Sequence, residues 1–552
     1  MHSEDDQKTA PEATHQPRVS ALVRLAVVMA VAYAVCLGSF SVLAHMGLQT
    51  QMNDLGNADQ AIWAASEGDW AMTVSNDLDG RLRSRIGIHA NFIYWPLSLV
   101  YRLWPDPILL LLVATVSCTA AGLGLFALAL RVLGPSWWTL VPPAAFYLSP
   151  MVQDANLYDF HALTIASACL VWAVWAFASH RDAVGFLLLF GALSCKEDVP
   201  LVGIALGVVY LLGGHRRRGL MVIALSTVYL LVVVGLLVPL FNAGEPPSKM
   251  ETSANRYAWL TEQPGLILST VLRPDRLRLP LYFLASGALA AWSARRWLLL
   301  LVPPLAAGWL SVTVWMTRLT GTYYWVVVEA AIVIACIYSV RPRSDDTPTK
   351  DRRPLAYLGA ATVVLTLLFS PLPYGMGAWR SNYLTSPDIV VLEGIARSIP
   401  NDAPISIQNN LGPHLSQRPD IASFPRRIDH AEWVLLQLRF HGGPSSGFFV
   451  RGTPRFVFGM EPETLARSVE ELLISPEWGL VLHHEGFYLF GRGEPEGLDP
   501  EAVATLFRDD VVAFADQLER SRAHRSPLTR LVVDTLSWGE LFGRDRGETS
   551  KR

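Results

Sequence analysis

The acidic residues Asp54 and Asp59 lie five positions apart in a polar stretch that follows the first apolar segment of the chain. The residues from Ala58 to Glu67 are good helix formers, so Asp59 falls in the first turn of a predicted helix, where free N–H groups favour a carboxylate. Asp54 then lies on the loop before this helix. Two facing carboxylates there could take a proton from a substrate or hold a metal ion. The alternative, favoured by spacing alone, is a helix cap that faces solvent.

Seven other ionisable residues stand in or beside apolar sequence, at places that the topology given below puts near the same outer face. An ionisable group at the centre of a membrane helix costs roughly 2.5 to 3.5 kcal/mol, so such a set predicts a water-filled cavity. The turn at Lys196 could instead be solvated, and Asp159 could simply cap the helix that follows it. The seven residues are His89, Asp159, His161, Lys196, Glu197, Asp198 and Glu329.

Arginines in the first two outer loops are candidates for binding phosphate. The topology rule for membrane proteins disfavours positive charge on the outer face, so arginines in outer loops indicate a specific role. A guanidinium group binds phosphate bidentately, and a lipid phosphate would supply that reason. Contact with anionic head groups, or salt bridges to nearby acids, is the alternative. The candidates are Arg81, Arg83, Arg85 and Arg256.

The composition is that of a polytopic membrane protein with a soluble part. Of the 552 residues, 51% are hydrophobic and only 17% are charged, which is too apolar for an ordinary soluble protein. The net charge of -3 excludes a strongly basic nucleic-acid-binding protein. The five cysteines fall in or beside apolar runs, which indicates neither a disulfide framework nor a metal site.

The distribution of Lys and Arg orients the apolar runs. If the N-terminus and the basic clusters near Arg216, Arg295 and Arg341 are cytoplasmic, the chain crosses the membrane about eleven times and its C-terminal part lies outside. We therefore predict a polytopic α-helical membrane protein with an extracytoplasmic α/β domain. Its parts are a disordered cytoplasmic tail (1–20), a transmembrane domain (21–373) with outer loops at 46–104 and 241–279, the α/β domain (374–493) and a helical tail (494–552).

The α/β domain is predicted from short apolar segments that alternate with polar ones. Strands are expected at 404–408, 433–438, 479–482 and 486–490, with an amphipathic helix at 463–474. The first strand runs into turn-forming residues, where ligand contacts are often placed. We expect this loop to form a rim of the cavity. Its three polar candidates are Asn409, Asn410 and His414.

Several motifs together resemble a known family. They are the stretch from Asn53 to Trp63, the stretch from His89 to Tyr101, "NLYDFH" at 156–161, "CKEDV" at 195–199 and "SIQNNLGPHLSQRP" at 406–419. Their joint occurrence resembles the bacterial predicted membrane proteins of domain-of-unknown-function family 2079, over roughly residues 45–490. That family is in turn similar in plan to the C-class (GT-C) glycosyltransferases.

The resemblance implies transfer of a sugar from a polyprenyl-phosphate donor on the outer face of the bacterial inner membrane. By position, Asp54 matches the acidic residue that follows the first span in those enzymes, and Asp59 is a second candidate. The familiar pair of adjacent acidic residues is absent, which leaves the base and any metal ligand open. A divalent ion, Mg²⁺ or Mn²⁺, could be held by Asp54, Asp159 and His161.

Three functions are therefore compared. The first is a glycosyltransferase, of the inverting GT-C type, in which Asp54 or Asp59 deprotonates the acceptor while arginines hold the donor phosphate. The second is a non-catalytic envelope-assembly or lipid-binding protein on the same scaffold. The third is a transporter, which a two-sided set of polar residues would indicate. The sequence crowds such residues on one face and so favours the first. The expected partners are a lipid-linked sugar donor and membrane lipids, with no nucleic acid.

Overall fold

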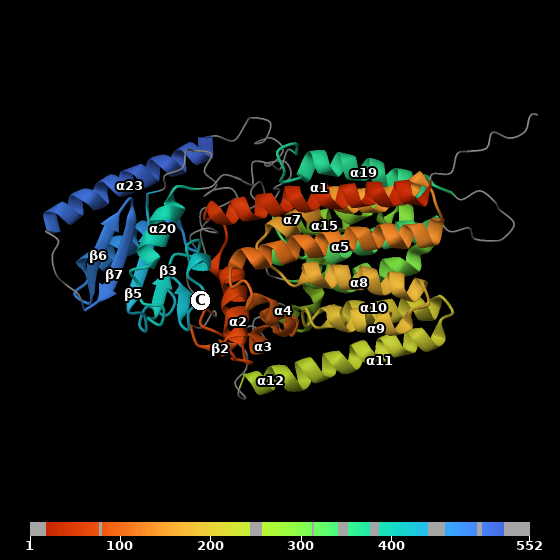
Figure 1. Cartoon of the computed structure of the whole chain (residues 1–552), viewed down its shortest axis with the longest axis horizontal. Coiled ribbons are helices and arrows are strands. Elements are labelled where there is room, and N and C mark those ends of the chain that lie inside the picture. The colour runs from red at the N-terminus through yellow and green to blue at the C-terminus, as the bar shows by residue number, and fades with distance from the viewer. Residues whose placement is uncertain are drawn as a thin grey trace, which may run out of the picture.

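The chain folds into a helical bundle and an α/β domain that lie at opposite ends of the molecule (Figure 1). A segment of short helices and strands lies between them, next to the end of the first helix. The computed structural model describes residues 18–76, 80–242, 257–311, 314–340, 351–375, 386–439, 459–493 and 500–523. The predicted tail at 1–20 falls mostly outside these ranges, and the helix α1 already begins at Val19.

The bundle is built from apolar helices whose positions follow the predicted runs. Its helices are α1 (Val19–Met46), α5 (Pro107–Leu133), α6 (Val141–Leu148), α7 (Pro150–Leu157), α8 (Leu163–Ala178), α9 (Asp182–Leu193), α10 (Val199–Leu212), α11 (Arg216–Val232), α12 (Val238–Phe241), α15 (Pro274–Phe283), η6 (Ala290–Leu301), α16 (Val302–Leu310), α18 (Val326–Ser339) and α19 (Arg353–Phe369). Within the described ranges, α1, α5 and the continuous helix Arg216–Phe241 are long and apolar enough to cross a membrane, and five shorter apolar helices accompany them. The number of eleven spans stays a prediction.

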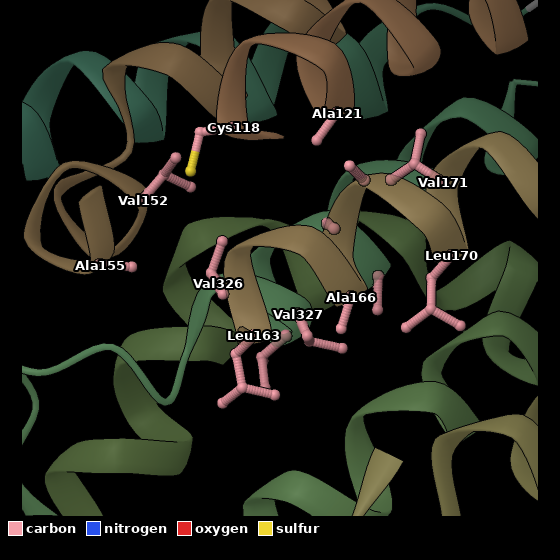
Figure 2. Packing of buried hydrophobic residues seen from close by; sticks show 14 of the residues in the cluster. Cys118, Ala121, Val152, Ala155, Leu163, Ala166, Leu170, Val171, Val326 and Val327 are labelled. Carbon is pink, nitrogen blue, oxygen red and sulfur yellow. The ribbon is translucent and has the colours of Figure 1, made fainter. Parts of the chain in front are cut away.

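Small side chains let the central helices approach closely. Figure 2 shows Cys118 of α5 beside Val152 of α7 within the buried cluster. A Cβ atom added at Gly124 of α5 would lie 2.8 Å from Cγ1 of Val171 on α8, so only glycine fits there. Such contacts between small residues are how helices associate in a membrane, where lipid is as apolar as the protein. The five cysteines are free, as the sequence predicted.

The segment between α1 and α5 carries the predicted first outer loop. The helix predicted from Ala58 to Glu67 is observed as α2. The elements are η1 (Met52–Gly56), α2 (Asn57–Ser66), β1 (Thr73–Val74), β2 (Arg83–Ser84), α3 (Arg85–Ile88) and α4 (Tyr94–Tyr101). In Figure 1 this segment lies between the bundle and the α/β domain.

The α/β domain contains a five-stranded sheet in the order β4-β3-β5-β7-β6. β3 pairs in parallel with β4 and β5, whereas β7 pairs antiparallel with β5 and β6. The four predicted strands and the predicted helix are observed, while β4 and α20 were not predicted because their apolar runs are short. The elements are α20 (Asp388–Ala396), β3 (Ile405–Ile407), β4 (Ile421–Ser423), β5 (Trp433–Gln437), α22 (Pro462–Ile474), β6 (Trp478–His484), β7 (Phe487–Arg492) and α23 (Pro500–Ala523).

The last helix, α23, packs against this sheet through a buried polar group. Asp510 of α23 accepts a hydrogen bond from the Tyr488 hydroxyl (2.7 Å) and lies 2.8 Å from His483 Nε2. It forms part of the predicted helical tail, whose residues 494–499 and 524–552 lie outside the described ranges. The described part of this tail is therefore docked onto the α/β domain.

Candidate functional site

A cavity of about 770 Å³ opens where the bundle, the first outer loop and the α/β domain meet. The loop before α2, the start of α8, the turn between α9 and α10, and the segment before α18 all contribute to its wall. The α/β domain adds Arg426 and Gly459. Seven predicted residues line it together: Asp54, Arg85, His89, His161, Lys196, Glu197 and Asp198.

Asp54 and His161 form a contact in the wall of this cavity. His161 Nε2 lies 3.3 Å from Asp54 Oδ1, and the side chains are 14% and 22% exposed. The His161 ring stacks on Tyr323 with 3.3 Å between centroids, which fixes its plane. Asp54 therefore points into the cavity beside a rigidly held imidazole, where a substrate proton could be taken up.

The hydrogen bond at Nδ1 of His161 determines the tautomer of the neutral ring, and so whether Nε2 faces Asp54 with a proton or with a lone pair. Nδ1 lies 3.1 Å from the Tyr158 carbonyl oxygen, which can only accept, so Nδ1 carries a proton. Burial lowers the pKa of His161, although Asp54 raises it. In the neutral imidazole, Nε2 then offers its lone pair to the Asp54 carboxyl and can share a proton that this carboxyl acquires.

The turn between α9 and α10 places an ion pair and a histidine–glutamate contact in the cavity wall. Lys196 pairs with Asp198 at 2.8 Å, and His89 Nδ1 lies 2.8 Å from Glu197 Oε1. Burial alone would lower the pKa of Lys196, but the charges of Asp198 and Glu197 outweigh it and raise the pKa. Burial would likewise raise the pKa of Glu197, but His89 and Lys196 lower it below its usual range. Both charges are thus held in place, unlike those of a solvated turn.

Three arginines line the cavity: Arg85, Arg318 and Arg426. Arg85 was predicted, and its Nε donates to Asn91 Oδ1 at 3.0 Å. Arg426 comes from the α/β domain and donates from Nη1 to Asn53 Oδ1 at 2.7 Å. These groups and Lys196 can bind phosphate oxygens. Of the other predicted arginines, Arg81 and Arg83 do not line the cavity, and Arg256 lies outside the described residues.

Asp54 lies in the π-helical segment η1 and not on the irregular loop that was predicted; we call residues 51–56 the Asp54 loop. This segment is held from both sides. From the bundle, Asp159 Oδ2 accepts the Gln51 backbone N–H at 3.0 Å. From the α/β domain, the Asn409 carbonyl accepts the Met52 N–H at 2.7 Å, and its side-chain Oδ1 accepts the Asn53 N–H at 3.2 Å. Asp159 and Asn409 are therefore positioning residues for the loop. Neither lines the cavity, so their predicted contact with a ligand is corrected.

The predicted rim is corrected for its other members as well. Asn410 is fully buried and accepts a hydrogen bond from Gln408 Nε2 at 2.9 Å. His414 stacks on His45 with 4.1 Å between ring centroids, behind the loop and away from the cavity lining. Glu329, which was expected to face the cavity, is 4% exposed within α18 and does not line it.

Asp59 does not face Asp54. Its carboxylate is fully buried and accepts hydrogen bonds from the Tyr101 hydroxyl and from Ser416 Oγ, the latter at 2.7 Å. Ser416 belongs to the α/β domain, so Asp59 joins α2 and α4 to that domain. The N-cap position of α2 is Gly56, so neither Asp54 nor Asp59 occupies it. Both the prediction of a second catalytic acid and the capping alternative are therefore corrected.

Burial raises the pKa of Asp59 to about 7, against the opposing effect of the Tyr101 hydrogen bond. The folded protein therefore holds a proton that the unfolded chain releases above its ordinary pKa of 3.8. The buried proton of Asp59 stabilises the folded state fully below pH 3.8. This stabilisation is lost as the pH rises through about 7, and the free energy of unfolding falls by about 1.4 kcal/mol per pH unit between pH 3.8 and about 7.

We expect the unfolding temperature in detergent to fall from pH 5 to pH 8, and the Asp59→Asn variant to lose much of this slope because it cannot ionise. Unfolding curves over this pH range measure the difference. A variant with the slope of the wild type would contradict the assignment of the effect to Asp59.

A metal site is not completed by the described residues. Asp54 and His161 could supply two ligands, but Asp159 bonds to the Gln51 backbone. No group of three His, Cys, Asp or Glu side chains that could hold a metal ion occurs in the described part of the chain.

Several cavity residues were not predicted from the sequence. They are polar or aromatic residues in loops or at the start of short helices, where no period or spacing marks them. The amide residues are Gln51, Asn53, Asn57, Asn76 and Asn91, and the aromatic ones are Tyr158, Tyr323 and Tyr324. For the first three, their closeness to Asp54 in the sequence was the available signal.

Comparison with known proteins gives one family, and the matching solved structures include two of one protein. Residues 44–448 match a family described as a predicted membrane protein (DUF2079). The fold is similar to ArnT from Cupriavidus metallidurans bound to undecaprenyl phosphate, with 14% identity, a TM-score of 0.49, and coverage of 87% of this chain and 100% of that chain. The apo state of the same protein gives 14% identity, a TM-score of 0.39, and coverage of 87% and 99%. No curated protein matches this sequence.

Proposed function

The chain belongs to the DUF2079 family of predicted membrane proteins, and on that premise we propose that it transfers a sugar from a polyprenyl-phosphate donor to a hydroxyl acceptor. The observation that carries this proposal is a single cavity in which the Asp54 carboxylate, four cationic side chains and an apolar wall occur together. In this proposal the protein lies in the bacterial inner membrane, with the cavity and the α/β domain on the outer side.

The cavity matches the chemistry of a lipid-linked sugar. Its apolar wall comes from helices of the bundle, including Leu201 of α10 and Pro303, Ala306 and Leu310 of α16. A polyprenyl chain is fully apolar, so contact with such a wall removes it from water and stabilises the complex. The phosphate at its head carries negative charge and suits the cationic side chains named above.

In the proposed reaction, the acceptor oxygen attacks the anomeric carbon of the donor sugar. Asp54 takes the acceptor proton as the new carbon–oxygen bond forms, and His161 Nε2 shares that proton. The bond from the anomeric carbon to the phosphate oxygen breaks, and its electron pair leaves with the polyprenyl phosphate. Arg85, Arg318, Arg426 and Lys196 stabilise the departing phosphate. The attack inverts the anomeric centre.

The proposal is tested by a transfer assay with purified protein in detergent or nanodiscs. A panel of polyprenyl phosphates with different radiolabelled sugars is offered together with a membrane acceptor fraction. We expect one class of donor to give labelled product and free polyprenyl phosphate in equal amounts. Absence of transfer from every donor, by protein that is folded and monodisperse, would instead favour a non-catalytic lipid-binding role.

A further inference from the structure

Amide side chains surround Asp54 in the cavity wall. Gln51 and Asn57 both line the cavity, yet they are only 3% and 2% exposed. The Asp54 N–H donates to the Gln51 carbonyl at 3.2 Å, and the Asn57 N–H donates to the Asp54 carbonyl. Gln51 and Asn57 thus stand three residues before and three residues after the proposed base, and each is tied to it through the backbone.

The orientation of the Gln51 amide follows from a chain of hydrogen bonds that begins at the backbone. The Asn53 N–H can only donate, so the oxygen of the Asn409 amide faces it at 3.2 Å. The Asn409 nitrogen then donates to Gln51 Oε1, also at 3.2 Å. Gln51 Nε2 is left as a donor, and it has no hydrogen-bond partner among the residues that the structure describes.

The orientation of the Asn57 amide also follows from a hydrogen bond to the backbone, but here the oxygen, an acceptor, is the atom left without a partner among the described residues. Its Nδ2 donates to the backbone carbonyl of Asn76 at 3.5 Å, and a carbonyl can only accept. Asn57 Oδ1 is therefore left as an acceptor, again with no partner within the described ranges. Buried polar atoms are nearly always hydrogen-bonded, and two complementary exceptions beside the proposed base indicate a ligand.

We infer that Gln51 Nε2 and Asn57 Oδ1 bind the hydroxyl groups of a neutral sugar ring next to Asp54. A hydroxyl both donates and accepts, so a ring with neighbouring hydroxyls satisfies both atoms. An ammonium group only donates and a carboxylate only accepts, so each satisfies one of the two. The ring belongs to the donor or to a sugar acceptor. The inference rests on the proposed function for the reaction, but binding tests it without turnover.

The experiment compares the affinities of three lipids: polyprenyl phosphate alone, with a neutral hexose, and with an amino sugar that carries a free ammonium. We expect the wild type to bind the neutral hexose lipid about tenfold more tightly than either of the others. In Asn57→Asp the carboxylate keeps the acceptor and attracts the ammonium, so the preference moves to the amino sugar. Asn401→Asp makes the same charge change at an exposed position and should keep the wild-type order.

Gln51→Glu is a second variant in case Asn57→Asp does not fold. It keeps the oxygen that accepts from Asn409 and replaces the free donor by an acceptor, so binding of the neutral hexose lipid should weaken.

Methyl hexoside is titrated separately and identifies an acceptor ring by raising the unfolding temperature of the wild type more than that of either variant. If neither the hexose lipid nor the methyl hexoside distinguishes the wild type from the variants, the inference is overturned and the proposed function stands. If no lipid binds, the proposed function fails, and the methyl hexoside comparison still decides the inference.

Discussion

Replacement of Asp54 by Asn is expected to reduce sugar transfer by about 10²- to 10⁴-fold, the usual contribution of a positioned base. The carboxamide has the same size but cannot accept the proton that the acceptor hydroxyl loses. The backbone hydrogen bonds that hold the loop involve Gln51, Met52 and Asn53, and the substitution leaves them in place. The unfolding temperature in detergent should therefore stay nearly unchanged. Initial transfer rates and unfolding curves of the two proteins measure the two quantities.

A matched control is available at Asp106, which does cap a helix. Its Oδ1 accepts the Ile108 N–H at 2.8 Å at the start of α5. Asp106→Asn keeps an oxygen for this bond and should keep wild-type transfer. Transfer at the wild-type rate in Asp54→Asn would remove Asp54 from the mechanism, whatever the effect at Asp106.

The second large effect is expected at Arg426, which brings a positive charge from the α/β domain into the cavity. Arg426→Met should reduce transfer by about 10²- to 10³-fold, the cost of removing one group that stabilises developing charge. Arg426→Lys keeps the charge but loses the planar pair of donors, so it should recover only part of the rate. Steady-state rates at saturating donor measure the effect.

Arg426 also bonds to Asn53, so a phosphate contact has to be separated from a positioning role. Binding of polyprenyl phosphate without a sugar makes this separation, because a purely positioning role would leave that affinity unchanged. We expect weaker binding in Arg426→Met. Arg397→Met removes an exposed arginine of α20's C-terminal end and serves as the control. Equal affinity in all three proteins would exclude Arg426 from the phosphate site.

The apolar runs and the Asp54 stretch could be predicted from the sequence because their signals are local. The relation of Asp54 to Asp59 was predicted wrongly for a reason that helix geometry explains. Asp54 lies in the π-helical η1 and Asp59 in the first turn of α2, which follows without a break, and only positions three or four apart share a face of a helix. One acid therefore lines the cavity, and the other is buried against α4.

Arg426 could not have been predicted as a cavity residue, because its place depends on how the α/β domain packs on the first outer loop. It is separated from Asn53 by 373 residues along the chain. No periodic pattern extends over such a distance. The same holds for Asn409, where the strand and the turn were predicted correctly but not the direction in which the turn faces.

The support of the Asp54 loop by Asn409 has a consequence for biosynthesis. The ribosome makes the bundle helices and Asp54 first, whereas Asn409 and Arg426 follow only after α19. While the early helices enter the membrane, the loop lacks its two hydrogen bonds to Asn409 and the cavity lacks one of its arginines. The nascent protein therefore holds its proposed base in an unfinished site. Competence for catalysis begins only when the C-terminal domain has folded against the loop.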